Sequence, residues 1–357
     1  MNRVGGPLVS TMGLTPAQRR VLYREHHAGK LEKLFPGVFV NREALGSYTA
    51  HFANDSELHY QLIVHAAAAS QPKGVLAGRS AACLRGLARP SSSYKFSHPG
   101  SIDIGFHYDS QAFTRHTADL PIHRRRLSRD VMSRTELLPT VFGELRVTSV
   151  EDTCMQLAQW YSVEEGCVGA ESALRHMPAD TYATTFGAHL VSRKHGARSA
   201  RQMLNLITPW SESPMESELK VRMWEAGLPA PYQQAMIHRP SGRFVGRVDF
   251  LFACGVVVEY DGREKYRHGA FGRDTYRADV EMAKELSRHK AIASLGYEII
   301  RIDRNSYRQG RRDDGWLGDI AHRVEWMRAH PGKITDAHWL AKGKAWREKG
   351  DVGWLSC

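Results

Sequence analysis

Acidic side chains interrupt two apolar, strand-like runs in the C-terminal third of the chain. Asp249 lies within one run, and Glu259 and Asp261 lie at the end of the next. A buried carboxylate is costly unless it is paired or binds a metal. Residues two apart in a strand share a face, so Glu259 and Asp261 should point the same way. Carboxylate oxygens suit a hard divalent cation. The pattern therefore predicts a metal site with Asp249, Glu259 and Asp261 as ligands.

Two of these carboxylates have a simpler structural explanation. Asp249 could form a salt bridge with Arg247 or Arg301, although the cost of burying a charge favours the metal. Asp261 precedes a glycine, and an Asp-Gly pair is typical of the turn that ends a strand. Both alternatives stay open on the sequence alone.

The predicted elements around these residues follow a fixed order. A helix over 213–226 precedes three strands, at 233–238, 243–252 and 256–260. A helix over 275–295 and a last apolar strand over 297–302 complete the segment. The order is thus α-β-β-β-α-β, with Asp249 on the second strand and Glu259 on the third.

Residues 213–305 resemble the very-short-patch-repair-endonuclease-like branch of the PD-(D/E)XK nuclease superfamily. The residues that carry the resemblance are Ser213-Pro214-Met215-Glu216-Ser217, Gly242-Arg243-Phe244, Arg247-Val248-Asp249, Val258-Glu259-Tyr260-Asp261-Gly262, Leu295-Gly296-Tyr297 and Ile300-Arg301. The resemblance implies a restriction-endonuclease-like core that uses Mg²⁺ (or Mn²⁺) to hydrolyse DNA. A bound divalent cation lowers the pKa of its water and so supplies the attacking hydroxide.

The resemblance also implies a role for Glu216, because this superfamily often supplies an acidic residue from its first core helix. Ser213-Pro214-Met215-Glu216 is at the same time a helix capping box. The cap explains Glu216 without any metal, and we place that role first.

The chain departs from the family pattern at the third active-site position. The superfamily motif ends in lysine, and Asp261 stands at that place. Lys265 and His268, in the following loop, are candidates to replace the lysine, His268 as a general acid. A solvated loop is the commoner explanation for Lys265. On the next helix, the basic residues that could face the site are Lys284, Arg288 and His289.

The N-terminal segment predicts a small winged-helix-like module. Thr15 and Pro16 open a helix that carries Arg19, Arg20 and Arg24, and a hairpin follows over 31–40. The segments 35–39 and 80–87 resemble the N-terminal region of abortive-infection E type antitoxins. This resemblance implies DNA binding through the basic helix. The alternative is a helical cap on the next domain.

The middle of the chain predicts an α+β domain in which no catalytic set of residues can be recognised. Ser80 is expected to cap one of its helices. A basic run from His123 onward places Arg124, Arg125 and Arg126 as candidate DNA contacts. A solvated loop is the commoner explanation for such a charge run.

Length and charge organise the whole chain. We expect four parts: a winged-helix-like module over 1–45, an α+β domain over 46–205, a nuclease domain over 206–308 and a helical tail over 309–357. The net charge of +11 favours a polyanionic partner such as DNA. No apolar run is long enough to span a bilayer. The five cysteines lack metal-site spacing and predict reduced thiols in the cytoplasm.

Together these observations predict a Mg²⁺-dependent DNA endonuclease with a DNA-binding N-terminal part. The alternative is a non-catalytic DNA-binding regulator or antitoxin-like protein that keeps a vestigial nuclease fold. No repeat or heptad pattern predicts self-assembly.

Overall fold

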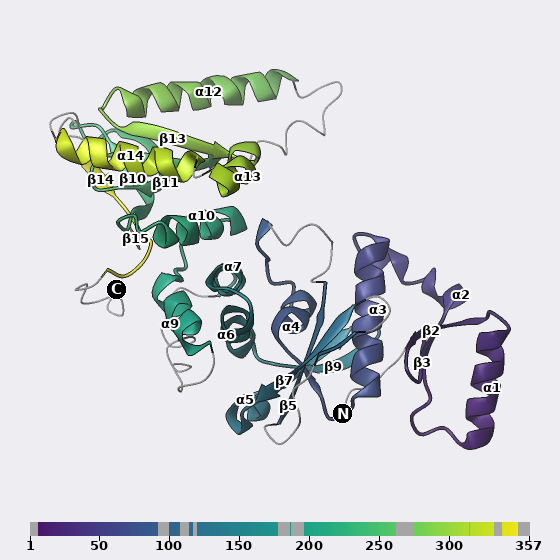
Figure 1. Cartoon of the computed structure of the whole chain (residues 1–357). Coiled ribbons are helices and arrows are strands. Elements are labelled where there is room, and N and C mark those ends of the chain that lie inside the picture. The colour runs from purple at the N-terminus through teal and green to yellow at the C-terminus, as the bar shows by residue number, and fades with distance from the viewer. Residues whose placement is uncertain are drawn as a thin grey trace. The chain divides into compact units, whose positions relative to one another are not determined.

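The computed structural model describes residues 6–91, 100–107, 114–116, 120–177, 186, 196–261, 275–313, 315–331 and 338–348. These residues form a mixed α/β protein with three sheets (Figure 1). They divide into two compact units. The first runs to Ala173 and includes the segment that ends at Met203, and the second includes Leu174 and the chain from Leu204 onward.

The first unit begins with a helix and a three-stranded antiparallel sheet in the order β1-β3-β2. Its elements are β1 (Leu8–Ser10), α1 (Pro16–His27), β2 (Leu31–Phe35) and β3 (Val38–Asn41). Thr15 starts α1 with a complete capping box, in which its side chain and that of Gln18 each bond the other's backbone N–H. Leu22 of α1 packs against Leu31 and Phe39. The predicted succession of a basic helix and a hairpin is therefore present.

The same small sheet also belongs to a larger core. Leu8, Val38 and Val40 pack in one cluster with Leu62 and Ile63 of α3 (Asp55–Ser70). Leu31 and Phe39 of this sheet thus contact α1, whereas Leu8, Val38 and Val40 contact α3. The N-terminal module shares its core with the middle of the chain.

The middle of the first unit is a six-stranded sheet in the order β6-β7-β5-β4-β9-β8. Its strands are β4 (Val75–Leu76), β5 (Ile102–His107), β6 (Thr114–His116), β7 (Pro121–Leu127), β8 (Glu136–Thr140) and β9 (Gly143–Val147). The other helices of this part are α2 (Arg42–Leu45), α4 (Gly78–Leu84), α5 (Arg129–Ser133), α6 (Val150–Trp160), α7 (Val163–Leu174) and α9 (Ala197–Leu206). The sheet contains both parallel and antiparallel pairs, and helices α4 and α5 lie between its strands in the chain.

Ser80 does not cap a helix, and that prediction is wrong. Helix α4 begins two residues earlier, at Gly78, and Ser80 is buried inside it. Its hydroxyl accepts the backbone N–H of Asp103 at 2.9 Å and lies 3.1 Å from the hydroxyl of Tyr60. A tertiary partner, rather than a helix end, explains this serine.

The second unit contains the elements that were expected to form the site, in the predicted α-β-β-β-α-β order. They are α10 (Pro214–Glu225), β10 (Tyr232–His238), β11 (Phe244–Leu251), β12 (Val256–Asp261), α12 (Thr275–Ala293) and β13 (Glu298–Asp303). The elements α13 (Arg304–Asp313), α14 (Gly315–Ala329), β14 (His338–Leu340) and β15 (Gly343–Lys344) follow. The sheet order is β13-β12-β11-β10-β14, and β15 also pairs with β10. The pair β12–β13 is parallel, and the others are antiparallel.

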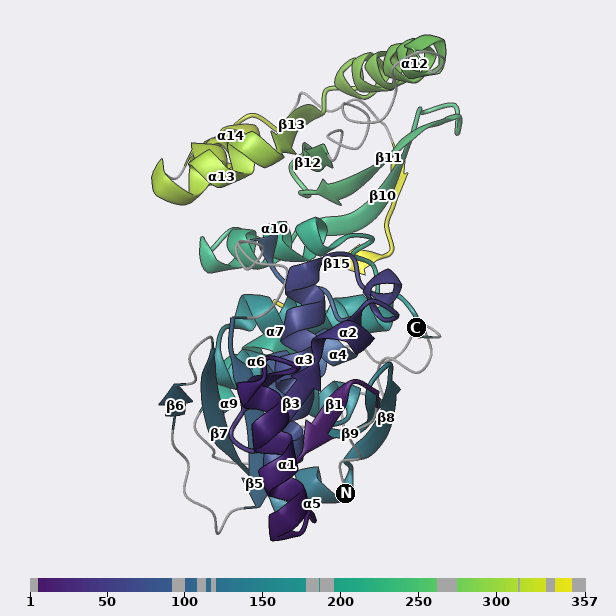
Figure 2. The same cartoon turned by 90° about the vertical axis from the view of Figure 1, so that its right-hand side faces the viewer.

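Helices cover both faces of this second sheet. Ile292 of α12 and Leu295, just beyond the end of this helix, pack against Val248 and Val257. Helix α14 contacts β12 and β13, and the two views place it on the side of the sheet away from α12 (Figures 1 and 2). Strand β12 is therefore buried on both faces, which explains its continuous apolar run. None of the described helices is both long and apolar enough to cross a bilayer.

Candidate active site

Glu216 lies in the first turn of α10, where it takes part in the helix cap. The Ser213 side chain accepts the N–H of Glu216 at 3.2 Å, and Pro214 stands where no intrahelical N–H partner exists. The Glu216 carboxylate accepts the Ser213 hydroxyl at 2.8 Å and the backbone N–H of Glu212 at 2.9 Å. The predicted capping role is confirmed, with the return bond one residue further from the helix than in a standard capping box.

Asp249 lies in an environment that disfavours its ionised form. Its half-buried carboxylate accepts the backbone N–H of Tyr260 at 2.9 Å. Burial and the negative charges of Glu216 and Glu259 raise the pKa of its carboxyl to about 7. The three acidic side chains therefore interact electrostatically, although they come from one helix and two different strands.

The two arginines that could have formed a salt bridge with Asp249 pair with other carboxylates. Arg247 pairs with Glu212 at 2.8 Å, and Arg301 pairs with Glu259 at 3.4 Å. Among the residues that the structure describes, no basic side chain forms an ion pair with Asp249. Negative charges therefore act on the carboxylate, and within the described ranges the backbone N–H of Tyr260 is the one hydrogen-bond donor to it.

Glu259 is held by two arginines. Arg288 of α12 donates to both carboxylate oxygens, at 2.8 Å and 3.0 Å, and Arg301 of β13 approaches from the neighbouring strand. Glu285 joins the network through both arginines, which lower the pKa of its carboxyl. Arg288 is therefore the one of the three basic residues proposed on this helix for which the structure records a contact with a predicted ligand.

For the other predicted site residues, the structure gives the position in the fold or the exposure of the side chain. Asp261 is half-buried at the end of β12, level with Asp303 in the parallel ladder. Lys265 and His268 lie outside the described residues. On α12, Lys284 is exposed and His289 is half-buried.

Gln234 is a member of the site that the sequence did not indicate. Its Nε2 donates to Glu216 Oε2 at 3.0 Å, and its side chain is buried. Two adjacent glutamines, Gln233 and Gln234, precede an apolar stretch. Two adjacent polar residues in an otherwise apolar strand are the sequence feature that could have suggested a polar site here.

The carboxylates are close, but their present geometry is not that of a formed metal cage. Within the described ranges, no three His, Cys, Asp or Glu side chains are gathered as ligands for one ion. The carboxylate oxygens of Glu216 and Glu259 already accept hydrogen bonds from protein donors. The oxygen-rich donor set matches the chemistry of a hard cation all the same.

The predicted DNA contacts on α1 are accessible. Arg19, Arg20 and Arg24 are all exposed, and Leu22 is the buried residue of the helix. The guanidinium groups therefore extend from a helix that is anchored through Leu22.

The predicted contacts on the basic run are split between two faces. The run lies in strand β7, so the interpretation as a solvated loop is wrong. Arg124 lies over the ring of Phe106, 3.9 Å from its centroid, while Arg125 donates to the buried Asp103 at 3.3 Å. Alternation along the strand puts the exposed Arg126 on the same face as Arg124. The three arginines therefore do not form a single patch.

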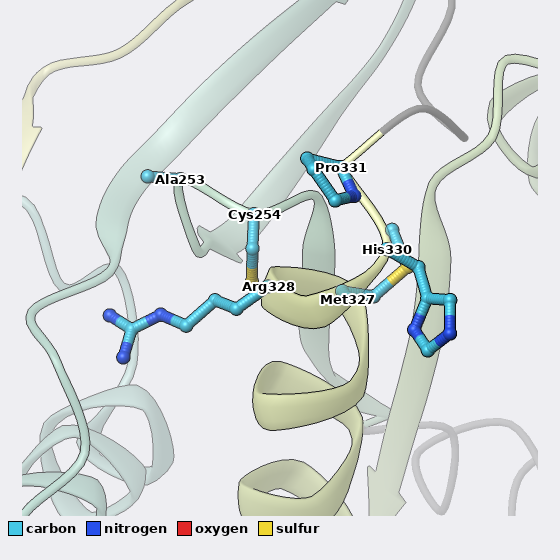
Figure 3. Close-up of a pocket in the computed structure, with 6 residues that line it drawn as sticks. All are labelled: Ala253, Cys254, Met327, Arg328, His330 and Pro331. Carbon is cyan, nitrogen blue, oxygen red and sulfur yellow. The ribbon is translucent and has the colours of Figure 1, made fainter.

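A separate hollow of about 380 Å³ lies at the turn between β11 and β12 (Figure 3). It is lined by Ala253, Cys254, Met327, Arg328, His330 and Pro331. The lining contains no carboxylate, so this hollow is not the candidate active site.

The chain is similar to two curated proteins of Mycobacterium tuberculosis, one from strain CDC 1551 / Oshkosh and one from strain ATCC 25618 / H37Rv. Both are described as uncharacterized proteins, and each is 27% identical over 231 residues, which cover 64% of this chain and 75% of the relative. No family model matches the chain.

Proposed function

We propose that this protein is a Mg²⁺-dependent (or Mn²⁺-dependent) DNA endonuclease that hydrolyses phosphodiester bonds with a metal-activated water. The observation that carries the proposal is the state of Asp249. Its carboxylate lies beside two other acidic side chains and lacks a basic partner among the described residues. A divalent cation is the species that would stabilise this concentration of negative charge.

The residues fit such a cation by their chemistry. Asp249 would hold it, with Glu216 and Glu259 as the neighbouring carboxylates. When bound, the cation would lower the pKa of a water and bind a phosphate oxygen. Arg288 and Arg301, which are fixed by Glu259, supply positive charge close to the position of the missing motif lysine. We assign these arginines to stabilising the negative charge of the phosphate.

The N-terminal part would hold the DNA. The exposed arginines of α1 and the net charge of +11 support contact with the phosphate backbone. Such contacts position a protein on DNA without choosing a sequence.

A second function is a DNA-binding regulator with a vestigial nuclease fold. The observation in its favour is that protein donors already occupy Glu216 and Glu259, so that no three-ligand group stands ready in the described part of the chain. This protein would bind DNA equally well with and without a divalent cation.

A cleavage assay separates the two functions. Purified protein is incubated with duplex, mismatched and single-stranded DNA in Mg²⁺, in Mn²⁺ and in EDTA, beside Asp249→Ala. The endonuclease proposal expects metal-dependent cleavage by the wild type, and it expects Asp249→Ala to bind DNA without cutting it. Binding of all substrates with no cleavage in either metal would instead establish the regulator.

A further inference from the structure

Gln234 has a backbone conformation that a glutamine rarely adopts. Its φ is 52°, and every other described residue with a positive φ is a glycine. A residue held in this region costs on the order of 1 kcal/mol or more, and it persists only where its surroundings enforce it. On β10 the neighbours Gln233 and Ala235 pair with Phe250 and Val248. This register places Gln234 opposite Asp249.

The side chain of Gln234 adds a second irregularity. It is 3% exposed, and its Nε2 donates to Glu216, while its Oε1 has no hydrogen-bond partner among the described residues. An ionised Glu216 carboxylate only accepts hydrogen bonds, which matches the amide nitrogen of Gln234 facing it. An unpaired buried carbonyl oxygen typically costs about 1–3 kcal/mol. Strain and an unsatisfied oxygen thus occur together at one residue.

Both irregularities lie among the acidic side chains. Gln234 touches Glu216, and the charge of Glu216 acts on Asp249, which lies across the ladder from Gln234. The β10–β11 register pairs the residues on either side of Gln234 and passes over Gln234 itself, and its buried Oε1 is unsatisfied among the described residues. An uncharged side-chain oxygen beside carboxylates is a common ligand of hard divalent cations.

We propose that Gln234 is a cation ligand, and that its Oε1 completes, with Asp249 and Glu216, the oxygen set that binds a divalent metal. The inference rests on the proposed function, because it names a ligand of the same site. It differs from the sequence expectation in bringing the neutral ligand from β10. Glu259 then serves mainly to fix the two arginines.

Binding of Mn²⁺ alone, followed by calorimetry or by the electron paramagnetic resonance of free Mn²⁺, tests the inference without any activity readout. Gln234→Met keeps the length of the side chain and removes the oxygen. Gln234→Gly removes the side chain and accepts the positive φ without strain, so the backbone is kept if methionine prevents folding. We expect each variant to weaken Mn²⁺ binding at least about tenfold, by analogy with the loss of supporting groups at metal sites.

Gln233→Met is the matched control. Gln233 is equally buried, but its Oε1 accepts the hydroxyl of Thr208 at 2.7 Å and its Nε2 donates to Ser211 at 3.1 Å. Because both ends of its amide have protein partners, we expect the folded control to keep the wild-type affinity for Mn²⁺. Circular dichroism establishes that each variant is folded.

The outcomes distinguish this inference from the proposed function. If Asp249→Asn loses Mn²⁺ binding while both Gln234 variants bind as tightly as the wild type, the ligand assignment of Gln234 is overturned and the metal site survives. If the wild type does not bind Mn²⁺, the assignment and the proposed function fail together. Weakened binding in both Gln234 variants with an unaffected Gln233→Met supports the assignment.

Discussion

Arg288 holds the carboxylate of Glu259 through two parallel hydrogen bonds, Nη1 to Oε1 at 2.8 Å and Nη2 to Oε2 at 3.0 Å. Arg288 also bonds the backbone carbonyl of Arg247 at 2.8 Å. One side chain of α12 therefore links the neighbouring strands β11 and β12 close to the candidate site. The two parallel hydrogen bonds fix the orientation of the guanidinium on the carboxylate more strongly than the ammonium group of a lysine would.

Removing Arg288 should destabilise the second unit. In Arg288→Ala, the largely buried Glu259 keeps only the more distant Arg301, and we expect unfolding to become easier by about 1–3 kcal/mol, discounted for the partial exposure of the pair. Chemical denaturation measures the loss. Arg288→Lys keeps the positive charge and loses the second hydrogen bond to Glu259. Its stability should therefore lie between that of the wild type and that of Arg288→Ala. Equal stability of all three proteins would contradict the bonding role.

Asp249 should make stability depend on pH when no divalent cation is present. Its pKa is raised from 3.8 to about 7 in the folded protein. The stability that its protonated form contributes is therefore fully present below about pH 4 and is lost as the pH rises through 7. Relative to Asp249→Asn, the wild type should lose on the order of 2–4 kcal/mol across this interval.

Denaturation of the wild type and Asp249→Asn in EDTA, at several values between pH 4 and pH 8, measures this difference. Asp319→Asn is the control, because it makes the same substitution at an exposed position of α14. Parallel curves for the wild type and Asp249→Asn would show that Asp249 is not perturbed.

Cation binding at the site should release a proton below neutral pH. An ion that requires the ionised carboxylate of Asp249 must displace its proton when the pH is below the raised pKa of about 7. We expect the apparent affinity for Mn²⁺ to rise as the pH increases toward 7 and to level off above it. Titration calorimetry in two buffers with different ionisation enthalpies counts the released protons. Binding with no proton release at pH 6 would place the cation elsewhere.

The arginines of α1 should govern the salt dependence of DNA binding. Replacing Arg19, Arg20 and Arg24 by Gln removes exposed charges and should leave the fold intact. If each contacts a phosphate, the slope of log affinity against log salt should flatten by up to about 2.7, at about 0.9 per contact. Fluorescence anisotropy on a duplex measures it.

The control for this experiment replaces exposed arginines of the second unit, Arg308 and Arg328, by Gln. We expect their loss to change the slope far less per residue. An unchanged slope in the α1 variant would remove that helix from the DNA interface.

The sequence by itself determined which elements form the second unit and in what order. Ser213 and Pro214 start α10, the apolar run from Val256 specifies a strand buried on both faces, and Gly255 permits the turn before it with a φ of 92°. These features act over a few residues, so local chemistry is sufficient to place them. The acidic residues on these elements could be located for the same reason.

Only the tertiary structure decided which partner each charged side chain takes. Arg288 reaches Glu259 from a helix 29 residues further along the chain, while Asp249 receives no such partner among the described residues. The alternation of β7 likewise turns Arg125 toward Asp103 and away from Arg124. These choices depend on strand register and on how α12 crosses the sheet. Periodicity in the sequence leaves both open, because a strand shifted by one residue has the same composition and the opposite face.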